Sequence, residues 1–297
     1  MSNRIEPWQG IMVATALPLR EDLSADFEAF AEHCRWLVEQ GCDGVAVNGS
    51  LGEYQTLSQE ERAKVVETAV AAVGGRNVMA GVGAYGSAES RRWAEQARDA
   101  GCASVMLLPP NSYRADERTV IDHYREVAKA GLPIVAYNNP YDTKVDLTPS
   151  LLARLFDEGL IVAVKEFTGD VRRAYEIAEL APGLDVLIGT DDVVLELALA
   201  GAKGWVAGFP NSLPASTVAL YHAAMAHDLE SALPLYRALH PLLRWDARTE
   251  FVQAIKLSMD LAGRYGGPCR PPRLPLTDEH ATAVRAATEK VLAEGLR

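Results

Sequence analysis

Lys165 stands at the carboxyl end of an apolar run, residues 161–164, whose composition is typical of a strand buried on both faces. Burial removes the hydration of an ammonium ion, so the pKa of such a lysine falls toward neutrality. The free amine is a nucleophile for carbonyl carbon, and the product is a Schiff base. The run by itself is equally consistent with a lysine that has no chemical role, whose aliphatic stem packs at the strand end while its amino group reaches solvent.

Groups that suit proton transfer and carboxylate binding follow two other apolar segments. Residues 49–53 are Gly-Ser-Leu-Gly-Glu, in which two glycines leave backbone N–H groups open to a carboxylate and Ser50 adds a hydroxyl. Residues 137–140 are Tyr-Asn-Asn-Pro, and the hydroxyl of Tyr137 is either a proton donor or a hydrogen-bonded packing group. Taken singly, these segments also fit a tight turn and a core aromatic.

A repeated pattern of helix, glycine and short apolar run predicts the elements that position these residues. Amphipathic segments, among them residues 25–39, 59–73, 88–100, 117–130, 171–180 and 193–200, alternate with apolar runs. Eight strands are predicted, near residues 11–17, 44–48, 78–83, 104–108, 133–138, 161–166, 184–189 and 204–209. Strict alternation predicts a parallel sheet of the α/β class, and eight units match a (β/α)8 TIM barrel. A doubly wound open sheet is the alternative.

The barrel is predicted to occupy residues 1–227, and residues 228–297 are predicted to form a C-terminal helical extension packed on it. In a TIM barrel the chemistry gathers at the carboxyl ends of the strands. Lys165 follows the same alternation as Ala163, and Tyr137 the same as Val135, so both are expected to face the barrel interior.

The composition of the 297 residues excludes several classes of function. A net charge of −11 leaves no basic surface for nucleic acid. The six histidines and four cysteines show no metal-binding spacing, so no metal is expected. No apolar stretch approaches the roughly 18 residues of a membrane span, and the sparse cysteines are typical of reduced thiols. A cytoplasmic protein with no membrane partner is therefore expected.

Two further motifs carry less weight. Residues 81–86 match the Gly-X-Gly-X-X-Gly pattern of dinucleotide loops, but residues 105–110 lack the acidic residue expected about 20 positions later. An NAD-dependent oxidoreductase is therefore a minor hypothesis. Asp191 and Asp192 precede an apolar helical segment, and they are predicted to cap that helix.

The motifs at residues 49–53, 137–140 and 164–166, in this order, resemble those of the dihydrodipicolinate synthase and N-acetylneuraminate lyase family. The resemblance covers essentially the whole chain. Members of that family are TIM barrels that act without a metal and attach a 2-oxo acid, often pyruvate, to a lysine of strand six. The resemblance thus implies a small-molecule 2-oxo-acid substrate, no cofactor, and a homodimer or homotetramer.

The same resemblance implies roles for individual residues. Lys165 would form the Schiff base, while Tyr137 and Ser50 would transfer protons. The backbone N–H groups of residues 50 and 51 would hold the substrate carboxylate. The residues expected to contact the substrate are Gly49, Leu51, Asn139, Asp142, Ser112, Tyr113 and Val206.

Three departures from the family pattern bear on the substrate. Asp142 stands where the synthases of the family carry an arginine for the second carboxylate of aspartate semialdehyde. Ser112, with Tyr113 beside it, stands where the family has a relay tyrosine, and Leu51 replaces a frequent threonine. These changes favour a catabolic aldolase, hydro-lyase or deaminase that acts on a hydroxylated 2-oxo acid or its cyclic imine. The alternatives are dihydrodipicolinate synthesis and a catalytically silent 2-oxo-acid-binding paralogue.

Overall fold

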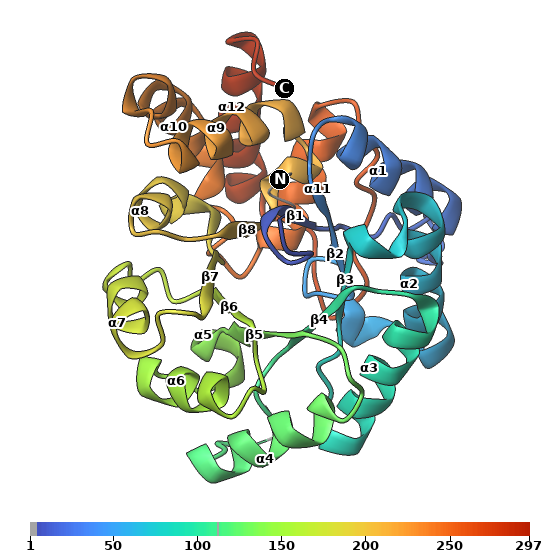
Figure 1. The fold of residues 1–297 in the computed structure, drawn as a ribbon. Coiled ribbons are helices and arrows are strands. Elements are labelled where there is room, and N and C mark those ends of the chain that lie inside the picture. Colours follow the sequence, from blue (N-terminus) through green and yellow to red (C-terminus); the bar gives the residue numbers. More distant parts are fainter. Residues whose placement is uncertain (1–4, 112) are drawn as a thin grey trace.

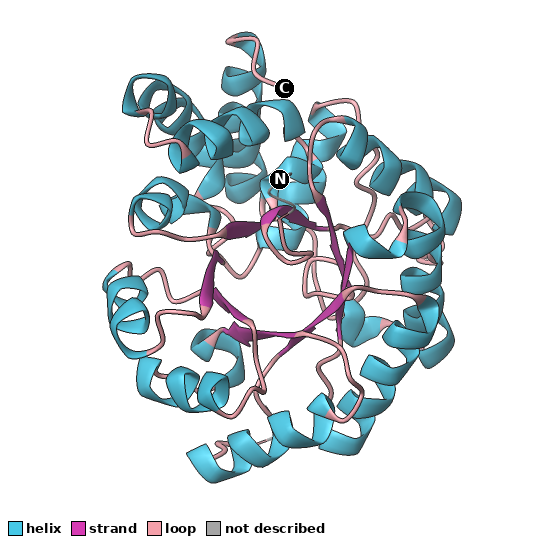
Figure 2. Ribbon diagram, viewed as in Figure 1, coloured by secondary structure: helices cyan, strands magenta, loops and turns pink. Residues whose placement is uncertain are grey.

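The computed structural model of the protein describes residues 5–111 and 113–297. Eight parallel strands close into a barrel in the order in which they occur along the chain (Figures 1 and 2). They are β1 (Gly10–Ala14), β2 (Gly44–Val47), β3 (Val78–Gly81), β4 (Ser104–Leu107), β5 (Ile134–Asn138), β6 (Ala163–Glu166), β7 (Asp185–Ile188) and β8 (Gly204–Ala207). The predicted TIM barrel is confirmed, and the doubly wound open sheet is wrong because β1 pairs with β8.

Helices surround the barrel, as Figure 2 shows for the ring of helices outside the strands. The main ones are α1 (Phe27–Glu39), α2 (Gln59–Val73), α3 (Ser87–Ala100), α4 (Glu117–Ala128), α6 (Pro149–Asp157), α7 (Arg172–Leu180), α8 (Val194–Leu199) and α9 (Pro214–Met225). Short helical turns lie in the connecting loops: η1 (Tyr54–Thr56), η2 (Gly75–Asn77), α5 (Pro140–Thr143), η3 (Asp191–Val193) and η4 (Phe209–Asn211). Local sequence sets several helix starts; Ser58 and Glu61, for example, form a capping box at the start of α2.

The chain ends in three helices, α10 (Leu229–Leu243), α11 (Phe251–Leu261) and α12 (Asp278–Ala293). Helix α10 packs on α9, and α12 packs on both α10 and α11 (Figure 1). This part of the chain also reaches the barrel mouth, because α11 carries the buried Lys256, whose amino group lies 2.8 Å from a carboxylate oxygen of Glu53 in the loop after β2.

The interior of the barrel is filled by side chains that alternate along the strands. This inner cluster consists of Met12, Ala46, Met79, Met106, Val135, Tyr137, Ala163, Leu187 and Val206. The alternation that the sequence predicts for Tyr137 is therefore confirmed. Strands β5 and β6 pair with Tyr137 opposite Lys165, which puts the two functional candidates side by side at the same rim.

The observed strands are shorter than the predicted ones, most clearly at the ends of the first and the sixth. Strand β6 begins at Ala163 instead of residue 161, although the N–H of Val162 already donates to the carbonyl oxygen of Ile134. The apolar composition continues beyond the paired segments because Ala16, Leu17 and Ile161 are buried in the main core, while Val162 packs against the inner cluster. Composition therefore marks burial here more accurately than it marks strand ends.

The glycines of residues 81–86 serve packing in this fold. A Cβ atom on Gly81 would lie 2.3 Å from the carbonyl oxygen of Asn48, so β3 can approach the end of β2 only with glycine there. The guanidinium group of Arg62 donates to the carbonyl oxygens of Gly81 and Gly83, each at 3.0 Å. The loop is thus occupied by protein contacts at the place where a dinucleotide motif would hold a pyrophosphate.

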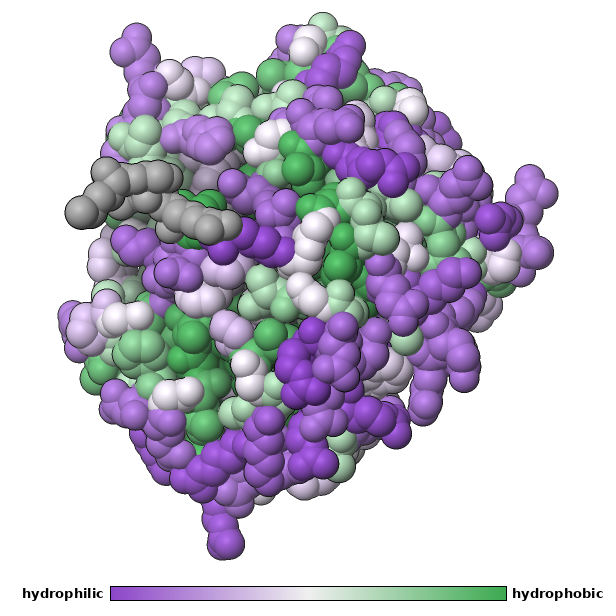
Figure 3. Space-filling model, turned by 45° about the vertical axis from the view of Figure 1, so that its right-hand side comes forward, coloured by the Kyte–Doolittle hydropathy of each residue, from purple (hydrophilic) through white to green (hydrophobic). Residues whose placement is uncertain are grey.

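The surface of the molecule is largely hydrophilic on the side shown in Figure 3. Figure 3 shows one side of the molecule, on which hydrophilic residues predominate and hydrophobic residues appear in groups between them. Among the helices described here, none is both long enough and apolar enough to cross a membrane.

A buried histidine links the first and last units of the barrel. The ring Nε2 of His33, in α1, lies 2.9 Å from the side-chain oxygen of Asn211, which also accepts the backbone N–H of Ala16. An amide oxygen can only accept, so Nε2 of His33 carries a proton and donates. Burial lowers the pKa of His33 to about 4, from an ordinary value of 6.5.

We expect the protein to lose stability as the pH falls from 6.5 to about 4. Unfolded chains bind a proton at His33 below pH 6.5 and folded chains do not until about pH 4, so the unfolded state binds more protons in this interval. The loss should approach about 3 kcal/mol for this one group. Urea titrations across this range should show a flatter pH dependence for His33→Gln than for the control His222→Gln, which alters an exposed side chain. Equal slopes would contradict this account of His33.

Candidate active site

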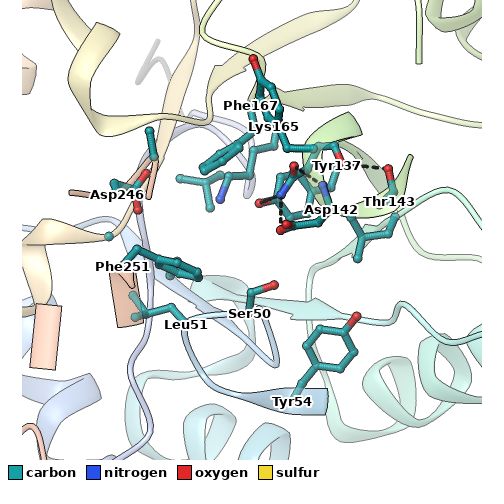
Figure 4. A pocket seen from close by; sticks show the side chains of 18 of the residues that line it. Ser50, Leu51, Tyr54, Tyr137, Asp142, Thr143, Lys165, Phe167, Asp246 and Phe251 are labelled. Atoms are coloured by element: carbon teal, nitrogen blue, oxygen red, sulfur yellow. Dashed lines mark hydrogen bonds between the residues drawn. The ribbon is translucent and has the colours of Figure 1, made fainter. Parts of the chain in front are cut away.

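A pocket of about 410 Å³ opens at the carboxyl rim of the barrel (Figure 4). Most of the predicted site residues line it: Gly49, Ser50, Leu51, Tyr137, Asn139, Asp142, Lys165 and Val206. They come from the ends of β2, β5, β6 and β8 and from the loops that follow. Parallel strands bring these ends together, because every strand of the barrel finishes at the same rim.

Lys165 projects into the pocket (Figure 4). Its side chain comes from β6 and is buried, with 6% of its surface exposed. The amino nitrogen lies 4.6 Å from the ring centre of Tyr137 and 5.5 Å from that of Phe167. Burial lowers the pKa of Lys165, and the carboxyl groups of Asp246 and Asp191 oppose that shift. The environment therefore favours a free amine at a lower pH than for a lysine in water.

Glu166, the residue after the lysine, holds the end of β6 in place. Its carboxylate accepts the N–H of Thr168 at 2.8 Å and the side-chain amide of Asn138 at 3.1 Å, and it pairs with Arg173 at 3.2 Å. All of these partners surround the strand end outside the pocket, and Glu166 does not line it. The acidic half of the Lys-Glu motif thus fixes the backbone from which Lys165 projects.

Tyr137 stands beside the lysine as a protonated hydroxyl. Burial raises its pKa far above the ordinary value. The side-chain amide of Asn139 donates to the tyrosine oxygen at 3.4 Å and to a carboxylate oxygen of Asp142 at 2.8 Å. Asn139 also caps the short helix α5 by accepting the N–H of Asp142 at 3.2 Å. Tyr137 is thereby oriented as a donor, and Asp142 is fixed at the rim.

The loop after β2 presents the backbone groups that the sequence predicts. Asn48 and Glu53 both have a φ of 55°, so the chain turns sharply on either side of residues 49–52. Among the described residues, neither the N–H of Ser50 nor that of Leu51 donates to a backbone carbonyl. Gln55 donates to the Ser50 hydroxyl at 3.3 Å. Ser50 and Leu51 both line the pocket, so this loop brings one hydroxyl and two amides without a backbone acceptor to the pocket wall.

The prediction that Asp191 and Asp192 cap a helix is wrong, because no side-chain hydrogen bond caps η3 or α8, and the buried residue of the two is Asp191. Its fully buried carboxylate accepts the N–H groups of Gly208 and Phe209 and the indole N–H of Trp205. It ties the loop after β7 to the loop after β8, because both strands end at the same rim. The position of Asp191 directly after a strand was the available signal.

Asp246 is a pocket residue that the sequence did not indicate. It lies between α10 and α11, where no strand end draws attention to it, and its carboxyl group lines the pocket. Burial and the neighbouring Asp191 raise the pKa of Asp246 well above the ordinary value, whereas Lys165 lowers it.

The sequence predicts that Ser112 and Tyr113, which follow β4 in the chain, both contact the substrate. Ser112 lies outside the described residues. Tyr113 does not line the pocket, and its side chain is 63% exposed, since the loop directs it to the surface. Tyr54 and Asn111 line the pocket instead. Tyr54 follows the Gly-Ser-Leu-Gly-Glu motif directly, so its closeness to that motif was a signal that could have been used.

Comparisons with known proteins agree with this geometry. A model of the dihydrodipicolinate synthetase family matches residues 7–291. The chain is 33% identical to 4-hydroxy-tetrahydrodipicolinate synthase of Methanothrix thermoacetophila over 96% of this chain and 97% of the relative. It is similarly 33% identical to a DapA-like lyase of Rhizobium meliloti over 91% of this chain and 92% of the relative.

Among solved structures, it is similar to YagE of E. coli, a prophage protein of the dihydrodipicolinic acid synthase family solved in complex with pyruvate. The TM-score is 0.88 at 26% identity, covering 97% of this chain and 99% of the other. The barrel, the lysine at the end of β6 and the match along nearly the whole chain lead to one conclusion. The chain belongs to the dihydrodipicolinate synthetase family and is a lyase of that family.

Proposed function

We propose that the protein is a Schiff-base-forming lyase whose nucleophile is Lys165 and whose substrate is a 2-oxo acid or its cyclic imine. One observation carries the proposal: a buried lysine of lowered pKa lies beside a protonated tyrosine, in a pocket lined by Ser50 and Leu51, whose amides have no backbone acceptor among the described residues. The amine attacks C2 of the substrate, and the protonated imine then accepts the electron pair of a broken C3–H or C3–C4 bond. Tyr137 and Ser50 donate and accept protons as the imine forms and as a C3–C4 bond breaks.

A hydroxylated catabolic substrate suits the rim of this pocket. Asp142 lines it and is held by Asn139, so a carboxylate faces the outer end of any bound 2-oxo acid. A carboxylate accepts hydrogen bonds from hydroxyl or iminium groups and repels an anionic aldehyde. We therefore propose aldol cleavage, dehydration or deamination of a hydroxylated 2-oxo acid or cyclic imine.

A second candidate, 4-hydroxy-tetrahydrodipicolinate synthase, is favoured by a separate observation. Arg248 and Arg273 also line the pocket, and their guanidinium groups pack over the rings of Trp245 and Phe251 at 4.3 and 5.4 Å. Within residues 5–111 and 113–297, neither arginine forms an ion pair, so both cations are available to a second carboxylate. The name of the Methanothrix relative fits this candidate.

Substrate profiling separates these candidates. We expect borohydride to trap pyruvate or a related 2-oxo acid on the protein. We also expect a kcat/KM at least about tenfold higher for a 3-deoxy-2-oxo sugar acid or pyrroline-4-hydroxy-2-carboxylate than for pyruvate with aspartate semialdehyde, a difference of about 1.4 kcal/mol in transition-state binding. The reverse ratio would favour the synthase. Trapping of an adduct without any turnover would favour the silent paralogue. If no 2-oxo acid forms an adduct, the Schiff-base proposal is rejected.

We further propose a cytoplasmic homodimer or homotetramer. The four cysteines are free thiols, and three of them are buried, which fits a reducing compartment. Sedimentation should then give two or four times the chain mass of 32.2 kDa.

A further inference from the structure

We propose that Asp246 is a catalytic residue of this enzyme, the group that removes a proton from C3 of the substrate bound to Lys165 and later delivers it to the leaving group. This inference rests on the proposed Schiff-base function. It adds a residue from the segment between α10 and α11, outside every motif that defines the site.

The geometry of Asp246 leaves one carboxylate oxygen available to substrate. The residue is 7% exposed, and its Oδ2 accepts the backbone N–H of Asp191 at 3.2 Å. The other oxygen, Oδ1, lies beside Gly208, where a Cβ atom would approach it to 2.8 Å. Both Asp246 and Gly208 line the pocket, so glycine at this position keeps the approach to Oδ1 open. In Figure 4 the amino group of Lys165 lies between Asp246 on one wall and Asp142 on the other.

The other groups in the pocket are poorly suited to accept a carbon-bound proton. Burial raises the pKa of Tyr137 and of Tyr54, so both hydroxyls remain protonated near neutral pH. Asp142 is exposed at the rim, where its carboxylate accepts the side-chain amide of Asn139 and its backbone N–H donates to the Asn139 side-chain oxygen. A buried carboxylate next to the nucleophile is the remaining base.

The environment of Asp246 suits a group that both takes and gives a proton. Burial and Asp191 raise its pKa, while the Lys165 ammonium or iminium charge opposes that shift. A pKa above the ordinary carboxyl value strengthens the base and keeps the acid form accessible. The negative charge also lies close to where the cationic imine forms, which stabilises that intermediate.

For a 4-hydroxylated substrate, the proposed reaction is an elimination of water. The amine of Lys165 adds to C2 and water leaves, which gives the protonated imine. The Asp246 carboxylate then takes one C3 proton, and the C–H electron pair becomes the C2=C3 bond of an enamine as the imine pair moves to nitrogen. The enamine next forms C3=C4, the C4–O bond breaks, and the departing oxygen takes the proton from Asp246 and leaves as water.

Pyruvate tests the first proton transfer without knowledge of the natural substrate. In D2O, enamine formation exchanges the pyruvate methyl protons, which NMR follows, while borohydride reports the amount of imine. For Asp246→Asn we expect trapping close to that of the wild type and an exchange rate per trapped adduct that is at least about 100-fold lower. The asparagine oxygen still accepts the N–H of Asp191, so the fold should be retained; a thermal melt checks this.

Two further variants complete the design. Asp192→Asn removes the carboxyl group that follows Asp191 in the chain and does not line the pocket. This variant should leave exchange per adduct within about twofold of the wild type. Asp246→Glu keeps a carboxylate but displaces it by one methylene, and should lower exchange per adduct by about tenfold or more.

The proposal is overturned if Asp246→Asn exchanges protons per adduct at a rate within about threefold of the wild type. It is also overturned if both Asp246 variants lose adduct and exchange in parallel, because a purely structural residue gives that parallel loss. Failure of the wild type itself to form any adduct would instead overturn the proposed function.

Discussion

Lys165→Met is expected to abolish both borohydride trapping and turnover, with activity falling by about four orders of magnitude or more, because the bond-forming nucleophile is lost. Methionine nearly preserves the volume that packs against Tyr137 and Phe167. It also removes an amine whose pKa burial lowers, so the free energy of unfolding should stay equal or increase. Mass spectrometry after reduction and a urea titration measure the two effects.

The control for this variant is Lys203→Met, which changes an exposed lysine between β7 and β8 at the opposite end of the barrel. It should trap the 2-oxo acid as the wild type does. An adduct of undiminished yield on Lys165→Met would show that another amine is the nucleophile. Loss of activity together with a large loss of stability would mean that Lys165 serves the fold.

Lys256→Met is expected to destabilise the protein by about 3–5 kcal/mol, the cost of leaving a buried charge without its partner. Lys256 and Glu53 are 2% and 1% exposed, and their charged atoms lie 2.8 Å apart. Glu53 also accepts the backbone N–H of Arg270 at 2.9 Å, and Lys256 donates to the carbonyl oxygen of Pro268. Because Glu53 ends the loop that presents the Ser50 amide, pyruvate binding should weaken as well. Urea unfolding and adduct titration measure the two losses.

Two comparisons make this prediction specific. The double variant Glu53→Gln/Lys256→Met removes both charges and should regain at least half of the lost stability, since no unpaired ion remains buried. Arg154→Ala breaks the exposed pair with Glu117 and should cost less than about 1 kcal/mol. A loss for Lys256→Met no greater than that for Arg154→Ala would show that the buried pair contributes little.

The contacts of the two motif glutamates, Glu53 and Glu166, could not be predicted from the local sequence. The Gly-Ser-Leu-Gly-Glu and Lys-Glu motifs located the site, but their acidic residues contact the scaffold: Glu53 pairs with Lys256 in α11, and Glu166 pairs with Arg173. Spacing predicts neither pairing, because Lys256 is 203 residues from Glu53, and Arg173, although only seven residues after Glu166, lies in α7 instead of on the strand. The sequence pattern thus marked the correct loops, but it did not reveal that the glutamate of each motif stabilises the backbone that presents the other motif residues.

The chain by itself determined the barrel and the placement of Lys165 and Tyr137. Strand alternation has a period of two, and parallel strands share one rim, so local order along the chain suffices to predict which side chains meet there. Only the tertiary structure brought Asp246 from beyond the barrel to the pocket, turned Tyr113 outward, and buried Asp191 between two loops. Those outcomes depend on loops and helices whose positions are set by long-range packing, and no local periodicity encodes that packing.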